Sequence, residues 1–153
     1  MKRDANIAPL SRDHHHSLLF CWKIRRGMAK GVDLERIRLY IIYFYKTHLE
    51  KHFLEEEALL FRVIDDPLCL RALAEHRRIR DLVTAIEGSD TRQAEYYGGL
   101  ADLVEVHVRF EERQLFPFLE QRLSNEQLSK VGDELNRMHD HPASDLYEDD
   151  FWN

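Results

Sequence analysis

A ten-residue pattern occurs twice in this 153-residue chain and restricts what the chain can fold into. Residues 52–61 and residues 107–116 both read HxxxEExxLF. Residues four apart lie on the same face of an α-helix, so in each copy the histidine and the first glutamate point the same way as the neighbouring apolar residues. An acidic residue followed by histidine precedes each copy, as Asp13-His14 and as Glu75-His76. The pattern predicts two copies of one helical hairpin.

The remaining sequence extends this prediction to five helices. Ser11, Asp33 and Asp66 are suitable N-caps, and Pro67 suits a first helical position. The expected helices cover residues 11–30, 33–64, 66–88, 93–122 and, after a capping box at Ser124 and Gln127, 124–138. Short connections make consecutive helices antiparallel. We therefore expect an all-α fold: an up-down-up-down four-helix bundle with a short fifth C-terminal helix.

Bulk properties exclude several classes of protein. The net charge of −6 argues against a general nucleic-acid binder, which normally shows a basic patch. No apolar run approaches the roughly 20 residues that a membrane span needs, and the N-terminus has no hydrophobic signal region. The two cysteines form no CxxC pair, which favours a reducing compartment. We expect a soluble, cytoplasmic protein with residues 1–139 as the bundle and 140–153 as an acidic, irregular or loosely packed tail.

Histidines and carboxylates are aimed into the predicted bundle core. Ionised groups buried there without compensation cost several kcal/mol each, and a metal cation removes that cost. Imidazole with carboxylate and no thiolate suits iron, manganese or zinc. The side chains are too many for one tetrahedral zinc site, whereas two metals bridged by two carboxylates would use them all. The candidate metal ligands are His14, His52, Glu56, His76, His107 and Glu111.

These motifs resemble those of the haemerythrin-like (HHE cation-binding) domain family, from Leu10 to about Arg122. The resemblance implies that His14 and His52 ligate one iron ion and that His76 and His107 ligate the other. It also implies that Glu56 and Glu111 bridge the two irons, with an oxygen species as a further bridge. The implied cofactor is a carboxylate-bridged pair of iron ions, with zinc or manganese as possible substitutes.

Two departures from the oxygen-carrying haemerythrins are visible. Those proteins use two histidines a turn apart on the third helix and HxxxxD on the fourth. Here Arg80 stands a turn after His76, and the fourth helix carries HxxxE. The second iron would have one imidazole fewer, which favours redox reactivity or sensing over reversible oxygen carriage. The paired HxxxE motifs are more similar to di-iron proteins implicated in repair of damaged iron–sulfur centres.

Several residues near these motifs have alternative interpretations. His15 is a second choice for the ligand of the first helix, whereas we expect His16 at the surface. His48, one turn before His52, is either an additional ligand or a residue next to a ligand. We expect Glu55, Glu57 and Glu112 to be solvated, although a carboxylate beside a metal can orient a ligating histidine. His139 and His141 are interpreted as tail residues.

The sequence favours a non-haem di-iron protein that binds or reacts with a small oxidant: dioxygen, peroxide or nitric oxide. Iron-centre repair or a stress response would be a suitable setting. The alternatives are a non-enzymatic iron or oxygen sensor, whose tail with Phe151-Trp152 would dock on a partner, and a metal-binding interaction module. No glycine-rich phosphate loop and no nucleophile with an ordered base points to an organic substrate, and the sequence identifies no protein partner.

Overall fold

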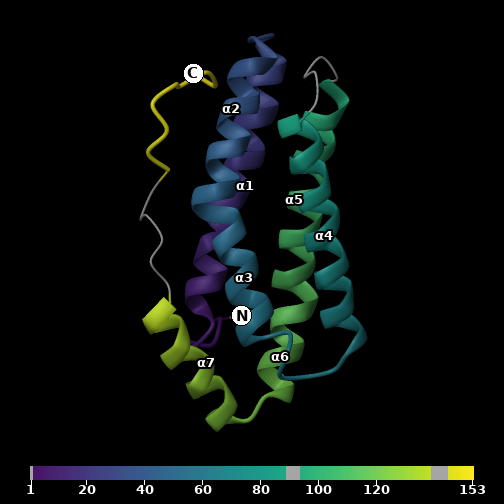
Figure 1. Cartoon of the computed structure of the whole chain (residues 1–153). Helices are drawn as coiled ribbons and strands as arrows, with labels where there is room; N and C mark the ends of the chain where they lie inside the picture. The colour runs from purple at the N-terminus through teal and green to yellow at the C-terminus, as the bar shows by residue number, and fades with distance from the viewer. Residues whose placement is uncertain (1, 89–93, 139–144) are drawn as a thin grey trace.

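The computed structural model describes residues 2–88, 94–138 and 145–153, which contain helices and no strand. Four long rods are followed by one shorter helix, as Figure 1 shows. The rods are α1 (Ala8–Ala29), α2 (Leu34–Phe44) continued by η1 (Tyr45–Leu49) and α3 (Glu50–Leu59), α4 (Pro67–Gly88), and α5 (Ala94–Phe110) continued by η2 (Glu111–Leu115) and α6 (Phe116–Arg122); the shorter helix is α7 (Asn125–Met138). The segments η1 and η2 are π-helical. The predicted all-α bundle with a short fifth helix is confirmed.

The rods close into a bundle in which each has two neighbours. The first rod packs against α5 and α2, and α4 packs against the same two helices from the other side. Consecutive rods run in opposite directions (Figure 1). The shorter α7 crosses the end of the bundle where it contacts α3. This arrangement gives all four rods an inward face toward one common core.

Several predicted helix ends are confirmed. The Asp33 carboxylate accepts a hydrogen bond from the Glu35 backbone N–H, and Asp66 caps the helix that begins at Pro67. Ser124 and Gln127 form the reciprocal contacts of a capping box. These short polar side chains satisfy backbone N–H groups that have no partner inside the helix.

Two other predicted ends are wrong. The first helix starts at Ala8 with proline in its first turn, so Ser11 lies inside the helix and its hydroxyl bonds the Glu112 side chain instead of capping. The second rod ends at Leu59, before the predicted end at Ile64, because residues 60–63 form turns. Neither difference moves the inward face of these rods.

The bundle has two apolar clusters, one toward each end. The first includes Phe20, Ile41 and Val83, and the second includes Leu10, Phe116 and Leu128. On every rod, buried histidine or glutamate residues lie between these clusters and form a polar layer across the middle of the bundle. The candidate metal ligands belong to this layer.

The described part of the C-terminal tail, residues 145–153, packs on the bundle. Phe151 is 1 % exposed and belongs to the first apolar cluster, where its ring lies against Gly27. Asp149 pairs with Arg36 at 2.6 Å. Figure 1 shows this segment along the α1 and α2 side of the molecule. The described tail residues are irregular, which is one of the two predicted alternatives, and they are not loosely packed because their aromatic side chains bury apolar surface. The division of the chain at residue 139 stays a prediction.

Among the described residues, none of the helices combines the length and the hydropathy that crossing a membrane requires.

Candidate metal centre

Six buried side chains from all four rods meet in the polar layer. They are His14 from α1, His52 and Glu56 from α3, His76 from α4, His107 from α5 and Glu111 from η2, and none is more than 2 % exposed. All six are the residues that the sequence pattern selects. Of the three consecutive histidines at 14–16, the structure brings His14 into the cluster and leaves His15 exposed.

The six side chains form two groups that share both glutamates. One group contains His14, His52, Glu56 and Glu111, and the other contains Glu56, His76, His107 and Glu111. Within each group the potential ligand atoms all lie within 4.8 Å of one another, which is suitable for holding one metal ion.

The shared glutamates face histidines from both groups. The Glu56 carboxylate lies 3.2 Å from His52 Nε2 through one oxygen and 3.2 Å from His76 Nε2 through the other. Glu111 Oε1 lies 2.9 Å from His14 Nε2 and 3.3 Å from His107 Nε2. Each glutamate therefore faces histidines of both groups, and either group could hold a metal cation.

A second set of carboxylates surrounds the cluster and bonds the Nδ1 atom of each histidine. The four contacts are His14 to Glu112 at 2.7 Å, His52 to Asp13 at 3.0 Å, His76 to Glu57 at 2.6 Å and His107 to Glu75 at 2.8 Å. A carboxylate accepts hydrogen bonds, so Nδ1 carries the proton and Nε2 is directed into the cluster. The expectation that Glu57 and Glu112 are solvated is wrong: both orient a histidine of the cluster.

Several inner atoms of the cluster make no hydrogen bond of normal geometry with another protein group. Both oxygens of Glu56, Oε2 of Glu111 and Nε2 of His52 are buried without a hydrogen bond. The Nε2 atoms of His76 and His107 are 3.0 Å apart. Two lone pairs at that distance repel each other unless a proton or a cation lies between them. Buried polar atoms of this kind normally have partners, so the donor set fits metal ions.

Basic and hydroxyl side chains hold three of the surrounding carboxylates. Arg80 Nη2 lies 2.8 Å from Glu57, and Arg71 Nε lies 3.0 Å from Glu75. Arg3, which precedes the first helix, reaches Glu112 at 3.4 Å, and the Ser11 hydroxyl donates to the same carboxylate. These contacts stabilise the ionised carboxylates that accept from the histidines.

The carboxylates change the ionisation of the histidines in the metal-free protein. Burial disfavours the imidazolium form, but the charge of Glu56 and the hydrogen bond to Asp13 raise the pKa of His52 to about 10. Burial opposes charge on His107 as well, and Glu111 and Glu75 raise its pKa to about 9. The pKa of His14 is also raised well above its usual value, because Glu111 and Glu112 outweigh burial. Protons therefore compensate the buried carboxylates where metal ions would otherwise do so.

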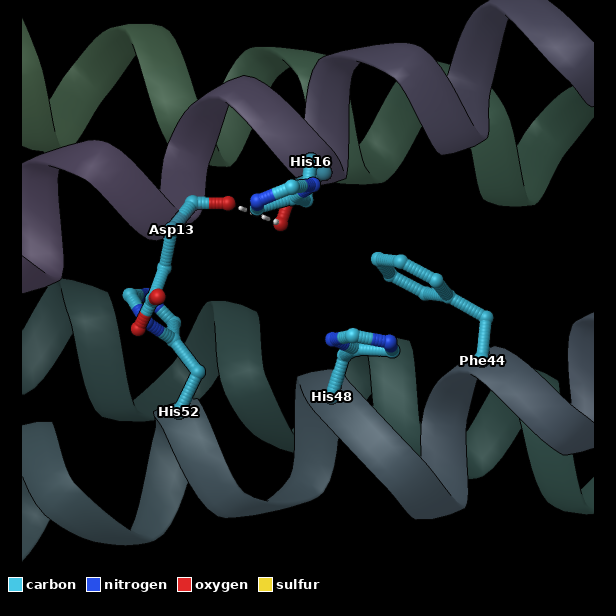
Figure 2. A pocket seen from close by; sticks show the side chains of 6 residues that line it. Asp13, His16, Phe44, His48 and His52 are labelled. Atoms are coloured by element: carbon cyan, nitrogen blue, oxygen red, sulfur yellow. Dashed lines mark hydrogen bonds and ion pairs between the residues drawn. The ribbon is translucent and has the colours of Figure 1, made fainter. Parts of the chain in front are cut away.

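A small cavity adjoins the cluster between α1 and the second rod. Its volume is about 10 Å³, and Asp13, His16, Ser17, Phe44, His48 and His52 line it. Figure 2 shows His16 and Asp13 reaching from α1 toward His48 and His52 on the opposite rod. This volume is about that needed for one water molecule. His48 is buried but belongs to neither metal-holding group of the described residues, and Glu55 is buried too, against the expectation that it is solvated. His139 and His141 lie outside the described residues.

Sequence reasoning did not find the two π-helical segments. One contains His48, and the other begins at the candidate ligand Glu111. Such segments occur often at functional sites. Pro117, in the first turn of α6 just after the second segment, is a signal for it. Proline has no N–H, and its ring clashes with the carbonyl four residues earlier in a regular helix. A wider π turn avoids that clash.

Fold and site together define a helical bundle that holds metal cations through buried histidine and glutamate side chains. A family model described as "Hemerythrin HHE cation binding domain" matches residues 6–119 and, in a second match, residues 71–148. The chain belongs to this family. The second match begins within α4, in the second hairpin, as an internal repeat would produce. No curated protein and no solved structure showed significant similarity to the chain.

Proposed function

We propose that this protein is a non-haem di-iron protein that binds or reacts with a small oxidant, namely dioxygen, peroxide or nitric oxide. The observation that carries the proposal is the pair of four-residue groups sharing Glu56 and Glu111. A nitrogen and oxygen donor set without thiolate suits iron among the redox-active metals. When bound, a pair of iron ions supplies one-electron and oxygen chemistry that no side chain provides.

Each of the two ions would be held by its own pair of histidines and by both glutamates. His14 and His52 would hold one ion, His76 and His107 the other, and Glu56 with Glu111 would neutralise charge on both. With two imidazoles and two shared carboxylates as ligands, each ion would have room for a small ligand. Arg80, a turn after His76, supports this view because its guanidinium contacts Glu57 and cannot be a ligand. The apolar clusters on either side exclude bulk water from the reacting molecule.

Iron-centre repair or a stress response is the physiological setting that we propose for such reactivity. The alternative, an iron or oxygen sensor that docks through its tail, has less support from the described residues. Phe151, the side chain most suited to docking, is buried in the protein's own core.

Metal content by elemental analysis, with an optical spectrum, tests the proposal on protein purified under mild conditions. We expect two irons per chain and near-ultraviolet absorption that bleaches on reduction. Bleached protein should regain its absorption on addition of dioxygen or peroxide, or change it with nitric oxide. One zinc per chain, or no metal even after anaerobic loading with iron, would overturn the di-iron proposal and leave an interaction bundle.

A further inference from the structure

Aromatic rings follow one another along the inner face of the second rod, one per turn, as far as the candidate metal centre. Tyr40, Phe44, His48 and His52 are spaced four residues apart, and Figure 2 shows the last three in succession. The ring centroids are 6.1 Å apart for Tyr40 and Phe44 and 5.0 Å apart for Phe44 and His48. Tyr43 offers a parallel connection, 6.4 Å from Tyr40 and 6.3 Å from His48.

The C-terminal tail extends this column of rings toward the surface. The ring of Trp152 lies 5.7 Å from that of Tyr40, and its indole is only half-buried. The Lys23 ammonium lies 4.0 Å from the centre of the Trp152 ring. The column therefore runs from His48, which lines the same small cavity as the candidate ligand His52, through buried rings to an indole that reaches solvent.

Bundle packing does not require this column, as the second hairpin shows. The residues that precede His107 at the spacing of Tyr40, Phe44 and His48 before His52 are Glu95, Gly99 and Leu103. The corresponding face of α5 therefore has no rings at these positions, although α5 packs in the same bundle. The column is a property of one hairpin alone.

The phenol in the middle of the column has a proton acceptor in contact. The Tyr40 hydroxyl donates to Asp145 Oδ2 at 2.5 Å, and Lys23 Nζ lies 3.1 Å from the same oxygen. Burial favours a neutral Asp145, but the hydrogen bonds from Tyr40 and Lys23 outweigh it and lower the pKa of this carboxyl. The carboxylate is thus ionised and can take the phenolic proton when Tyr40 loses an electron.

We propose that this column carries oxidising equivalents from the candidate centre to Trp152. A centre that is oxidised when no reaction partner is present would then be reduced by electrons from the protein's own aromatic rings. The inference rests on the proposed function. One electron passes from Tyr40 to the oxidised centre while the phenolic O–H bond breaks and its proton moves to Asp145. The phenoxyl radical then takes an electron from the Trp152 indole and recovers the proton from Asp145.

The last transfer leaves an indole radical cation beside an ammonium group. The Lys23 charge disfavours that cation, so the indole N–H proton is released to solvent. The neutral radical is reduced by a small thiol or ascorbate-type reductant in solution, which gives one electron and one proton. Electrons and protons then balance over the whole sequence.

The two tryptophans of the chain make the test internally controlled. Full-length protein loaded with iron is treated with hydrogen peroxide without reductant, and oxidation at each tryptophan is measured by peptide mass spectrometry. Trp22 is 50 % exposed, more than Trp152, and would take most of any damage from oxidants free in solution. We expect oxidation to be several-fold greater at Trp152 and to require bound iron.

Two variants distinguish oxidation that travels along the column from oxidation that depends only on the exposure of the tryptophan. Tyr40→Phe keeps the ring and removes the hydroxyl; we expect several-fold less oxidation at Trp152 and a weaker organic-radical signal in freeze-quenched electron paramagnetic resonance. Tyr96→Phe, an exposed tyrosine on α5, should change neither quantity. Greater oxidation at Trp22, or an unchanged Trp152 yield in Tyr40→Phe, would overturn the path. Iron content and bleaching are read on the same samples: a protein that takes up no iron would overturn the proposed function and this inference with it.

Discussion

Each histidine of the candidate centre uses both ring nitrogens. Asp13 and Glu75 bond the histidine of their own hairpin, His52 and His107. Glu57 and Glu112 reach across and bond a histidine of the other hairpin. The surrounding carboxylates therefore fix the ring orientation and the tautomer of each histidine. The contacts of Glu57 and Glu112 also connect the two hairpins.

Glu111→Gln should remove metal from the protein. The amide keeps the shape of the side chain but loses its charge and one of the two oxygens that face the cluster. Because those oxygens face both groups, we expect iron per chain to fall at both positions, measured by elemental analysis. Glu126→Gln, on the exposed side of α7, is the control. Full iron content in Glu111→Gln would show that this carboxylate is not a ligand.

Arg80→Met should weaken metal binding without removing any candidate ligand. Loss of the guanidinium leaves Glu57 less strongly held, so His76 is oriented less well. Changes around metal ligands commonly cost 10–100-fold in affinity, and we expect about tenfold here because Arg80 acts through Glu57. Competition with a chelator measures the effect. Arg77→Met, an exposed neighbour on α4, should bind metal as the unchanged protein does; equal affinities in both variants would contradict the assigned role.

The same ten-residue motif takes two helical geometries in the two hairpins. Its first copy lies mostly in α3 and ends in a turn, whereas its second copy is π-helical from Glu111 to Leu115 and continues into α6. Both copies still bury the leucine and phenylalanine that end the motif. The local geometry thus differs between the two copies, while the inward direction of the side chains is kept.

The C-terminal tail behaves as part of the core, which gives a stability prediction. Phe151→Ala should cost about 3–5 kcal/mol of unfolding free energy, the usual cost of truncating a buried phenylalanine. Leu146→Ala, in the same tail but 72 % exposed, should change it by less than about 0.5 kcal/mol. Urea denaturation measures both variants. Similar midpoints for the two would mean that the tail does not pack as described.

For the whole molecule, the stability of the fold depends on the ionisation of the histidines in the polar layer. The metal-free protein holds protons on His52 and His107 at pH values where the unfolded chain has released them. Metal ions need neutral imidazole ligands, so binding iron releases these protons. The metal-free and the iron-loaded protein should therefore respond to pH in opposite ways.

Metal-free protein should lose stability as the pH rises. The ordinary pKa of histidine is 6.5, and the folded values are about 10 for His52 and about 9 for His107. A raised folded pKa contributes stability that is complete below 6.5 and is lost as the pH passes through the folded value. Urea midpoints of metal-free protein should thus fall between about pH 7 and pH 10. His52→Gln should flatten that fall; a midpoint that rises over this range would contradict the geometry of the cluster.

Helical periodicity explains why so much of the centre could be predicted from the sequence. The HxxxE spacing and the phase of His14 and His76 with apolar neighbours place six side chains on inward faces, since residues three or four apart share a face. Short connections, in turn, make neighbouring helices antiparallel. These are local properties, and the sequence carries them directly.

Other features depend on how close the rods come to one another. The bonds from Glu57 and Glu112 to the opposite hairpin, the guanidinium of Arg80 on Glu57 and the position of Phe151 against Gly27 join residues far apart in the chain. Glu57 looks solvated in the sequence because its partner, His76, lies on another helix. Helix periodicity determines the direction in which a side chain points, but the packing of the whole chain determines which residues that side chain contacts.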